Sequence, residues 1–508
     1  MKTLGIDVGT GGSRALIMDE TGRVVGSATH DHVAFASPEI GWAEQDPHDW
    51  WAATRMAIRK VLGQTSTTSD EIAAVALTGQ MHGAVLLDDK DEVLRPALIW
   101  CDQRTAEECV YLNETVGSDR IIDLTCNPAL TNFTLTKLLW VRKHEPEIWK
   151  RFRSFLLPKD YVRMRMTGVK AIDVAEASGT LLLDVANRRW SKEMMGAVGL
   201  DEHCAPQVFE SPEVVGRISV LGAAETGLKV GTPVIAGAGD QAAGAVGMGI
   251  VSTGAVSATI GTSGVVFAAT DRPALDPRGR VHTFCHAVPG RWHVMGVTQA
   301  AGLSLRWFRD NFGAGNDDGR DPYERLCQEA AKAKAGEDGV YWTPYLMGER
   351  TPHLDPEARA ALVGLNAKHG RGTIIRAILE GVAFSLRDTF SIFDEMRVPV
   401  TEVRLGGGGA RADLWRQIQA EIYGRTVSTV KAEEGAAYGA AILAGVGVGQ
   451  WPDVESACHE VVKIDRVVDP DRKSAEIMNS CYEVYRRIYP ALAPLFHPAA
   501  QEAKVETA

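Results

Sequence analysis

Paired cysteines are missing from this sequence of 508 residues. Its eight cysteines are scattered, with no CxxC and no regular spacing, which argues against a disulfide framework or a zinc module. The N-terminus, MKTLGIDVGT, runs straight into a strand-like pattern and shows no signal-peptide core. No uncharged apolar run approaches the length that spans a membrane. We therefore expect a cytoplasmic protein with reduced thiols and no membrane partner.

An excess of basic residues is also missing. The chain has 54 Lys and Arg against 65 Asp and Glu, and its net charge of −11 opposes binding to a nucleic acid backbone. A phosphate-binding loop of the form GxxxxGK[ST] is absent too. The composition is that of an ordinary globular protein, and the chain is too long for one core. We expect two domains, 1–250 and 251–508, divided within the loose segment 247–255.

Strand-like and helix-like segments alternate along the chain, which favours an α/β fold. Residues 2–25 read as three strands separated by turns, and 72–87 as a strand region broken by glycines. Residues 46–63 have helical spacing, with Asp46 and Pro47 as the N-cap and first-turn pair. Further helices are expected at 371–396 and 414–424, and one long helix at 471–495 before a polar tail.

Two segments half a chain apart echo each other. LGIDVGTGGSRALIMD (4–19) and VSATIGTSGVVFAATD (256–271) both place an apolar strand before Gly-Thr, small residues, a second strand and an aspartate. Strand, Gly-Thr, strand is a common local pattern, so coincidence is one explanation. The alternative is a pair of related domains that face each other.

The first of these turns, DVGTGGSR, is a candidate anion site. Its consecutive N–H groups at 9–13 can form a nest, because glycines permit positive φ and close approach. Thr10 and Ser13 add hydroxyls, and Arg14 adds a cation suited to phosphate oxygens. Asp7, at the strand end, is a candidate ligand of Mg²⁺. The competing interpretation is a tight glycine hairpin with a surface arginine.

Two glycine clusters mark the second half. GTSG at 261–264 is a candidate second phosphate turn, although a purely structural turn is the safer interpretation of this motif taken alone. RLGGGGARADLWRQI at 404–418 ends a strand with four glycines and opens an amphipathic helix, which suits a nucleotide close to a helix N-terminus. The small-residue segment 433–445 is expected to form a helix packed under that site.

Two further segments carry candidate substrate contacts. LTGQMHGAV places Met81 and His82 between glycines at a strand end, where both side chains can reach into a cleft; a structural histidine is the alternative. LIWCDQRT places Trp100 where it can stack on a sugar or belong to the core. In the simpler interpretation, Asp102 and Arg104 only form an ion pair that holds this loop in place.

A lone charge, Asp240, follows the apolar strand in TPVIAGAGDQAAGAVGMG. One explanation is an N-cap for the small-residue helix that follows, and another is a turn carboxylate. A carboxylate at a helix start is also held in place and ionised, which a general base acting on an alcohol requires.

Together these motifs resemble the FGGY family of carbohydrate kinases, which share the two-domain fold of actin, Hsp70 and hexokinase. The first hairpin is similar to the family's phosphate motif, and NFTLTKLLWVRKHEPE and AALVGL with RAILEGVAFSLRD are similar to its two signatures. GAGDQAAGAVGMG resembles the catalytic-aspartate motif, and GGGGARADLWRQIQAEIYG the adenosine motif. They run in order from 4 to about 445, and TGQMHGAVLLD with LIWCDQRT is most similar to the family's D-xylulose kinases.

The resemblance implies two ribonuclease H-like domains flanking a deep catalytic cleft, with ATP and Mg²⁺ bound there. It implies that Asp240 is the general base, and that Asp7 and Asp240 hold the metal. It assigns the sugar site to Met81, His82, Trp100, Asp240 and Gln241. It assigns the nucleotide site to Thr10, Gly11, Ser13, Arg14, Gly261, Thr262, Gly407, Gly408 and Gly409.

The implied reaction is phosphorylation of D-xylulose to D-xylulose 5-phosphate, and the implied assembly is a homodimer. A kinase for ribulose, an alditol or glycerol is the nearest alternative; the Met81–His82 pair counts against glycerol, where relatives have Arg-Glu. A non-catalytic nucleotide switch of the Hsp70 or actin kind would need a peptide-binding domain or a filament surface. A sugar-binding regulator would be expected to lose Asp7 or Asp240, and both are present.

Overall fold

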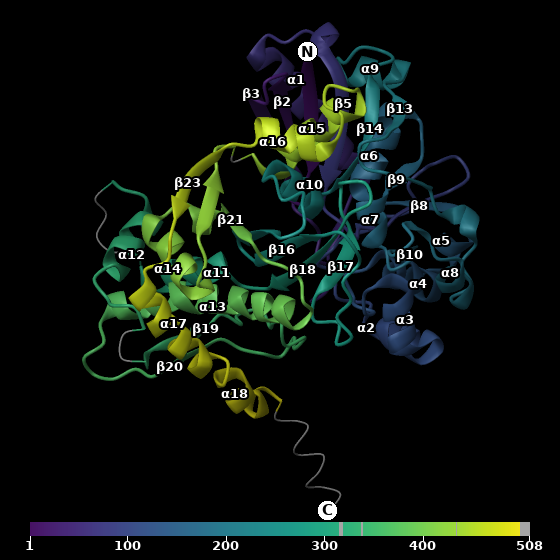
Figure 1. Ribbon diagram of the computed structural model, residues 1–508. Coiled ribbons are helices and arrows are strands. Elements are labelled where there is room, and N and C mark those ends of the chain that lie inside the picture. Colours follow the sequence, from purple (N-terminus) through teal and green to yellow (C-terminus); the bar gives the residue numbers. More distant parts are fainter. Residues whose placement is uncertain (314–318, 337–338, 433, 498–508) are drawn as a thin grey trace, which may run out of the picture.

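The computed structural model describes residues 1–313, 319–336, 339–432 and 434–497. Two central sheets organise the chain, one of six strands and one of seven (Figure 1). The first has the order β13 (Val214–Arg217), β14 (Pro233–Gly239), β5 (Ile72–Gly79), β1 (Lys2–Val8), β2 (Gly12–Asp19) and β3 (Val24–Asp31). The second has the order β17 (His282–Cys285), β18 (Trp292–Thr298), β16 (Gly264–Thr270), β15 (Ala255–Ile260), β21 (Glu402–Gly407), β22 (Val427–Val430) and β23 (Ile464–Val468).

The two sheets share one topology. In the first, β1 pairs antiparallel with β2 and parallel with β5, which is parallel to β14. In the second, β15 pairs antiparallel with β16 and parallel with β21, which is parallel to β22. The echo between 4–19 and 256–271 is therefore a repeated β-hairpin, and the predicted α/β fold with two ribonuclease H-like sheets is confirmed. Parallel strands place their carboxyl ends at one edge of a sheet, where ligands bind in such folds.

Helix α1 (Pro47–Thr65) covers one face of the first sheet. Asp46 is its N-cap and accepts a hydrogen bond from the backbone N–H of His48, with Pro47 as the first helical residue, as predicted. The buried side of the helix, which includes Trp50 and Ile58, packs against Ile6 of β1 in one apolar cluster.

The opposite face of the first sheet is covered from the other half of the chain. Helix α15 (Gly435–Gly447) packs on β1 and β5 and crosses α10 (Asp240–Gly247). Figure 1 shows α15, with the adjoining α16 (Val454–Val461), over the strands of the first sheet. A Cβ on Gly5 would collide with the backbone of Ala437, and a Cβ on Gly439 with that of Ala243. Glycine at these two positions therefore permits the close packing of α15 on β1 and α10. The prediction that 433–445 packs under the glycine-rich loop is therefore wrong, and residue 433 lies outside the described residues.

The C-terminal helices pack on the second sheet. Helix α13 (Arg371–Glu395) and helix α14 (Asp413–Tyr423) match the predicted segments closely and share one core with α17 (Arg472–Tyr485). The predicted single helix at 471–495 is wrong, because α18 (Ile488–Phe496) starts separately. Pro490 explains the break, since a proline ring clashes with the carbonyl four residues earlier, here that of Arg486. The predicted polar tail lies outside the described residues.

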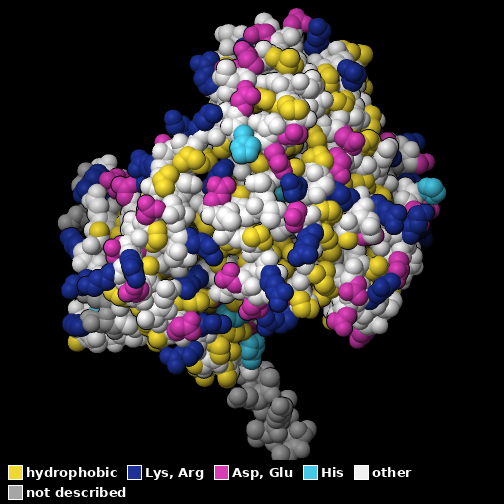
Figure 2. All heavy atoms as spheres, viewed as in Figure 1, with side chains coloured by type: hydrophobic (Ala, Val, Ile, Leu, Met, Phe, Trp, Pro, Cys, Tyr) yellow, Lys and Arg dark blue, Asp and Glu magenta, His cyan; other side chains and the backbone are white. Residues whose placement is uncertain are grey.

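The remaining helices and short strands of the first half form a lobe beside the two sheets (Figure 1). Its main helices are α2 (Ala106–Leu112), α3 (Ser118–Thr125), α4 (Thr134–His144), α5 (Pro146–Arg151), α7 (Val174–Ser178) and α8 (Lys192–Ala197). Helices α6 (Pro158–Thr167) and α9 (Val220–Thr226) instead pack with α1 at the first sheet. Within the described ranges, no helix is long and apolar enough to cross a membrane. On the face shown in Figure 2, basic and acidic side chains are interspersed.

Candidate active site

Two carboxylates lie at the carboxyl edge of the first sheet. Asp7 stands one residue before the end of β1, and Asp240 follows the last residue of β14; β5 lies between these two strands. Asp7 shares a sheet face with Gly5, two residues earlier, and therefore points to the side that α10 and α15 cover. Asp240 is the first residue of α10 and Gly239 is the N-cap, so the interpretation of Asp240 as the N-cap is wrong by one position.

Burial and mutual repulsion set the charge of this pair. Burial, with the nearby charge of Asp7, raises the pKa of Asp240 to about 7, although hydrogen bonds from Gln241 oppose the rise. Burial raises the pKa of Asp7 to about 6 against the attraction of Arg14. Within the described chain, Oδ1 of Asp7 has no hydrogen-bond partner. Both groups therefore titrate near neutral pH, as acid–base residues of active sites commonly do.

Arg14 lies directly opposite Asp7 in the β1–β2 pair, so both side chains are on one face. Its Nη2 donates to Ser27 at 3.1 Å, while its Nε has no partner among the described residues. Ser13 points to the other face, where its hydroxyl is fully buried against His32 and Thr54. Its hydroxyl is therefore turned away from the predicted phosphate position.

The turn between β1 and β2 is tied to the segments that carry Gln80 and Trp100. The Thr10 hydroxyl donates to Oε1 of Gln80 at 3.2 Å and accepts from Nε1 of Trp100 at 2.9 Å. The N–H of Gly9 bonds to the carbonyl of Gly12, so the predicted anion nest is reduced to the groups that follow Gly9. Gly11, at the tip of the turn, is exposed. The turn is thus a fixed platform and not a flexible hairpin.

His82 is held in one tautomer. Its Nδ1 lies 2.7 Å from the carbonyl oxygen of Gly179; since a carbonyl only accepts, Nδ1 carries the proton and Nε2 is an acceptor. Burial lowers the pKa of His82 to about 3, so the ring is neutral. The backbone of His82 has φ of 68°, and its carbonyl accepts from Nζ of Lys137 at 2.9 Å and from the hydroxyl of Thr134 at 3.1 Å.

Met81 connects His82 to Asp240. Its thioether packs against Gly239, the residue before Asp240, and its terminal methyl packs against Gly179, which also contacts His82. The predicted sugar contacts are therefore brought together, with Met81 between Asp240 and His82. Trp100 is 37% exposed and bonds to the neighbouring turn instead of joining the core.

The loop after Trp100 is held by an ion pair, in agreement with the simpler interpretation of Asp102 and Arg104. Their side chains are 2.7 Å apart and buried, and Arg104 also pairs with Glu44 at 2.8 Å. Asp102 in addition accepts from the N–H of Ala43 at 2.7 Å. Both side chains support the loop and are not free to bind a ligand.

Glu176 on α7 is a buried acid that sequence reasoning missed. Both of its oxygens lack a partner among the described residues, and burial raises its pKa well above the usual range, with a contribution from Asp240. Next to it, Lys159 forms buried ion pairs of 2.6 Å with Asp160 and with Asp173. These groups lie at 159–176, far from Asp240 in sequence, and only the pairing of distant elements brings them together.

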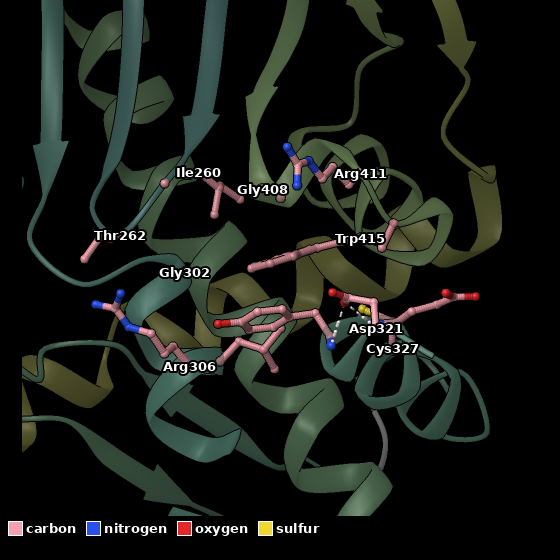
Figure 3. Close-up of a pocket in the computed structure, with 15 residues that line it drawn as sticks. Ile260, Thr262, Gly302, Arg306, Asp321, Cys327, Gly408, Arg411 and Trp415 are labelled. Carbon is pink, nitrogen blue, oxygen red and sulfur yellow. Dashed lines mark hydrogen bonds between the residues drawn. The ribbon is translucent and has the colours of Figure 1, made fainter. Parts of the chain in front are cut away.

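A cavity of about 500 Å³ lies on the second sheet, within the size range of small-molecule sites, roughly 300–1,000 Å³ (Figure 3). Four predicted nucleotide residues line it: Gly261, Thr262, Gly408 and Gly409. Gly407 is not in its lining but shapes the turn, because its φ of 71° suits glycine and a Cβ there would strike the carbonyl of Ile260.

The remaining wall comes from elements that sequence reasoning did not use. Helix α11 (Gly302–Phe312) contributes Arg306, and helix α12 (Pro322–Ala330) contributes Tyr323. Gly302 donates its N–H to the carbonyl of Gly261 at 2.9 Å and so ties α11 to the predicted phosphate turn. Figure 3 shows Trp415 of α14 across the cavity, between the Gly408 turn and these two helices.

The described residues contain no cluster of three or more His, Cys, Asp or Glu side chains poised for a metal. Mg²⁺ does not need one, because it keeps several waters and binds through one or two carboxylates and phosphate oxygens. Asp7 and Asp240 provide an oxygen-only pair of this kind, and the unpartnered Oδ1 of Asp7 is available to it. The residues present therefore fit Mg²⁺.

A pair of buried carboxylates lies at the edge of the first sheet, and a cavity of small-molecule size lies on the second sheet, which has the same topology. This arrangement defines a two-domain phosphotransferase. Residues 2–247 match the N-terminal domain of the FGGY family of carbohydrate kinases, and residues 256–448 match its C-terminal domain. The chain belongs to this family, and its expected class, a carbohydrate kinase, is confirmed.

Particular relatives cover nearly the whole chain. The xylulose kinase of Escherichia coli (strain K12) is 39% identical over 493 residues, which are 97% of this chain and 99% of the relative. The xylulose kinase of Bacillus subtilis (strain 168) is 38% identical over 486 residues, 96% of each chain. The crystal structure of a "xyloylose kinase" from Brucella ovis superposes with a TM-score of 0.90 at 36% identity, covering 97% of this chain and 100% of that one.

Proposed function

We propose that this protein transfers the γ-phosphoryl group of ATP to the terminal hydroxyl of D-xylulose, forming D-xylulose 5-phosphate and ADP. The names of its relatives support the substrate. The observation that carries the proposal is Asp240, a carboxylate with a pKa of about 7 set beside the Met81–His82 pair. Such a group is suited to accept a proton from an alcohol at neutral pH.

In this proposal the two halves divide the substrates. Residues 1–250 bind the sugar and supply the base, and residues 251–508 bind the nucleotide in the 500 Å³ cavity. The fold departs from the predicted domain boundary at 250 in one respect. Helices α15 and α16 follow that boundary in sequence but pack on the first sheet. Because α10 and α15 cross, movement at this crossing is a means of closing the two halves over both substrates.

The proposed reaction is an in-line displacement. The terminal hydroxyl oxygen of the sugar attacks the γ-phosphorus, its proton passes to Asp240, and the bond from phosphorus to the ADP oxygen breaks. Asp240 must be ionised for this step. Arg14 and the N–H groups of the turn after Gly9 contact the transferring phosphoryl group, whose charge they stabilise.

Asp7 and Asp240 would hold Mg²⁺, which neutralises charge on the phosphate oxygens when bound. Gln241 keeps the Asp240 carboxylate oriented through its hydrogen bonds. Nε2 of His82 accepts a hydrogen bond from a sugar hydroxyl. Trp100 is fixed by its hydrogen bond to Thr10, and its exposed ring packs against the C–H face of the sugar.

A panel of acceptors tests the proposal. ADP release is measured with D-xylulose, D-ribulose, xylitol, glycerol and D-gluconate, for the natural protein and for Asp240→Asn. D-xylulose is expected to give the highest kcat/KM, and Asp240→Asn to lose at least ~10³-fold of it, within the range that acid–base groups contribute. Higher kcat/KM on another acceptor would replace the substrate, and near-normal turnover of Asp240→Asn would remove the base.

A further inference from the structure

Lys137 of helix α4 is a buried amine that has no carboxylate partner. Its side chain is fully buried, and it forms no ion pair with any residue in the part of the chain that the structure describes. Burial lowers the pKa of Lys137 to about 7, although the attraction of Asp102 opposes the fall. An apolar side chain of similar volume would fill the same space without this cost. The amine therefore needs a reason that packing does not supply.

The amine of Lys137 is hydrogen-bonded to two backbone carbonyl groups. Its Nζ donates to the carbonyl oxygen of His82 at 2.9 Å and to the carbonyl oxygen of Asn132. A lysine amine keeps two N–H groups after it loses a proton, so both hydrogen bonds are available on either side of pH 7. The side chain thus ties the loop before α4 to the residue that follows Met81.

The backbone of His82 is held in an unusual conformation. Its φ of 68° lies in the left-handed region, which residues other than glycine rarely adopt. Its carbonyl oxygen accepts from Lys137 and also from the hydroxyl of Thr134 at 3.1 Å, so both lone pairs of this oxygen are used. Because these two donors fix the direction of the carbonyl group, they oppose relaxation of His82 to an ordinary φ.

The same segment also holds the His82 ring. Phe133, between Asn132 and Thr134, packs edge-on against the imidazole with 5.2 Å between the ring centroids. The ring must stay in this place for Nδ1 to donate to the carbonyl of Gly179 at 2.7 Å. That bond sets the tautomer and leaves Nε2 as the acceptor. A change in the φ of His82 would swing the ring away from Gly179 and remove the cause of this tautomer.

We propose that Lys137 is a positioning residue for sugar binding, which fixes the backbone of His82 so that Nε2 stays the acceptor at the sugar site. This inference rests on the proposed function, in which Nε2 accepts a hydrogen bond from a sugar hydroxyl. Lys137 does not touch the sugar in this assignment and acts through His82 alone. Its removal is therefore expected to weaken sugar binding no more than removal of the His82 acceptor itself.

A double-mutant cycle tests this assignment. Lys137→Met is expected to raise the KM of D-xylulose about 10-fold, as loss of the His82 acceptor does, and to change kcat less, because it does not contact Asp240. In a protein that already carries His82→Phe, the same substitution is expected to raise the KM less than about 2-fold, because the residue through which Lys137 acts is gone. A lysine that only stabilises the fold would act equally in both backgrounds.

Nitrogen-15 NMR of the His82 ring gives a readout that does not depend on turnover. In the natural protein at pH 7, Nδ1 is expected to carry the proton and Nε2 to be unprotonated. In Lys137→Met, the signals of both ring nitrogens are expected to shift toward a mixture of the two tautomers, because the ring is no longer held against Gly179.

Thr134→Val and Thr136→Val form a matched pair that decides the question if Lys137→Met fails to fold. Both threonines are buried in the first turn of α4. The hydroxyl of Thr134 donates to the carbonyl of His82, whereas that of Thr136 donates to the carbonyl of Phe133 at 2.8 Å. Thr134→Val is expected to raise the KM of D-xylulose about 3-fold, the effect of losing one neutral hydrogen bond, and Thr136→Val to leave it unchanged.

Three results would overturn the role of Lys137. These are an equal effect of Lys137→Met with and without His82→Phe, an unchanged His82 tautomer in Lys137→Met, and equal KM values for Thr134→Val and Thr136→Val. Absence of D-xylulose turnover in the natural protein would instead refute the proposed function. The tautomer of His82 still tests Lys137 in that case, so the two failures are distinguishable.

Discussion

The carboxylates of Asp7 and Asp240 stand at the ends of two strands of one sheet, and the charge of Asp7 helps to raise the pKa of Asp240 to about 7. The sequence around either residue does not indicate that the other lies nearby. Their effect on each other comes from β1 and β14 flanking β5, which places both strand ends at one edge.

This relationship predicts a pH dependence. Because the base must be ionised, kcat/KM should fall as the pH drops below about 7 in the natural protein. Asp7→Asn removes a charge that raises the pKa of Asp240, so the pKa of Asp240 should move down in that variant. Carbon-13 NMR titration of the Asp240 carboxyl measures it directly. Asp89→Asn, on an exposed loop, is the control, and an equal titration in Asp7→Asn would contradict the coupling.

Arg14→Ala should weaken catalysis more than nucleotide binding. Arg14 lies opposite Asp7, and in the proposed mechanism its guanidinium meets the phosphoryl group chiefly as charge develops in transfer. We expect kcat to fall about 100-fold, as when one oxyanion donor is lost, with the Kd for ATP changed much less. Single-turnover rates and calorimetric titration give the two quantities. A loss in affinity that accounts for the whole loss in rate would indicate a ground-state contact.

His82→Phe should raise the KM for the sugar about 10-fold by removing the Nε2 acceptor, without moving the acid limb of the pH profile. The reason is that the pKa of His82 is about 3, too low to set a limb near neutrality. Rates measured from pH 5 to 9 compare the variant with the natural protein. Disappearance of the limb in His82→Phe would assign it to the histidine instead of Asp240.

Gly302→Ala tests the proposed nucleotide cavity. A Cβ at this position would strike the carbonyl of Gly261, so the substitution must displace the phosphate turn from α11. We expect the KM for ATP to rise at least ~10-fold while the KM for the sugar stays the same, since misplaced contacts cost binding locally. Gly370→Ala, where a Cβ meets open space, serves as the control. A selective change in the sugar KM would contradict this placement of the nucleotide.

Gly439→Ala tests the crossing of α10 and α15. Its Cβ would collide with the backbone of Ala243, and overpacking of this kind should lower the free energy of unfolding by about 2 kcal/mol. Gly244→Ala, on α10 but with open space around its Cβ, should be neutral or stabilising by up to ~1 kcal/mol. Chemical denaturation measures both. Equal stabilities for the two variants would mean that the helices can separate without cost.

Local features were predictable because their causes are local. Asp46 and Pro47 begin α1 through a side-chain cap and a fixed φ, and neither depends on the rest of the fold. The repeated hairpin at 4–19 and 256–271 was visible as a repeated string of residue types. The lone Asp240 was conspicuous because a charge directly after a buried strand requires a reason.

Features set by long-range packing were not predictable. The small residues of α15 indicated close packing correctly, but nothing in them specified that the partner is β1, more than 400 residues away in sequence, an arrangement seen in the contact of Gly5 with Ala437. The direction of the Ser13 hydroxyl follows from the face of β2 on which it falls, which the turn motif does not reveal.

By itself the sequence determined the strand–turn–strand units, the helix starts and the residue types suited to phosphoryl transfer, because propensity, capping and glycine turns act over a few residues. Tertiary structure alone decided that Asp7 and Asp240 lie at one edge of a sheet, where the charge of Asp7 raises the pKa of Asp240, and that Nε2 of His82 is the free acceptor. The physical reason is that pKa values, tautomers and unpaired charges depend on burial and on neighbours supplied by distant segments, which only the assembled fold brings within reach.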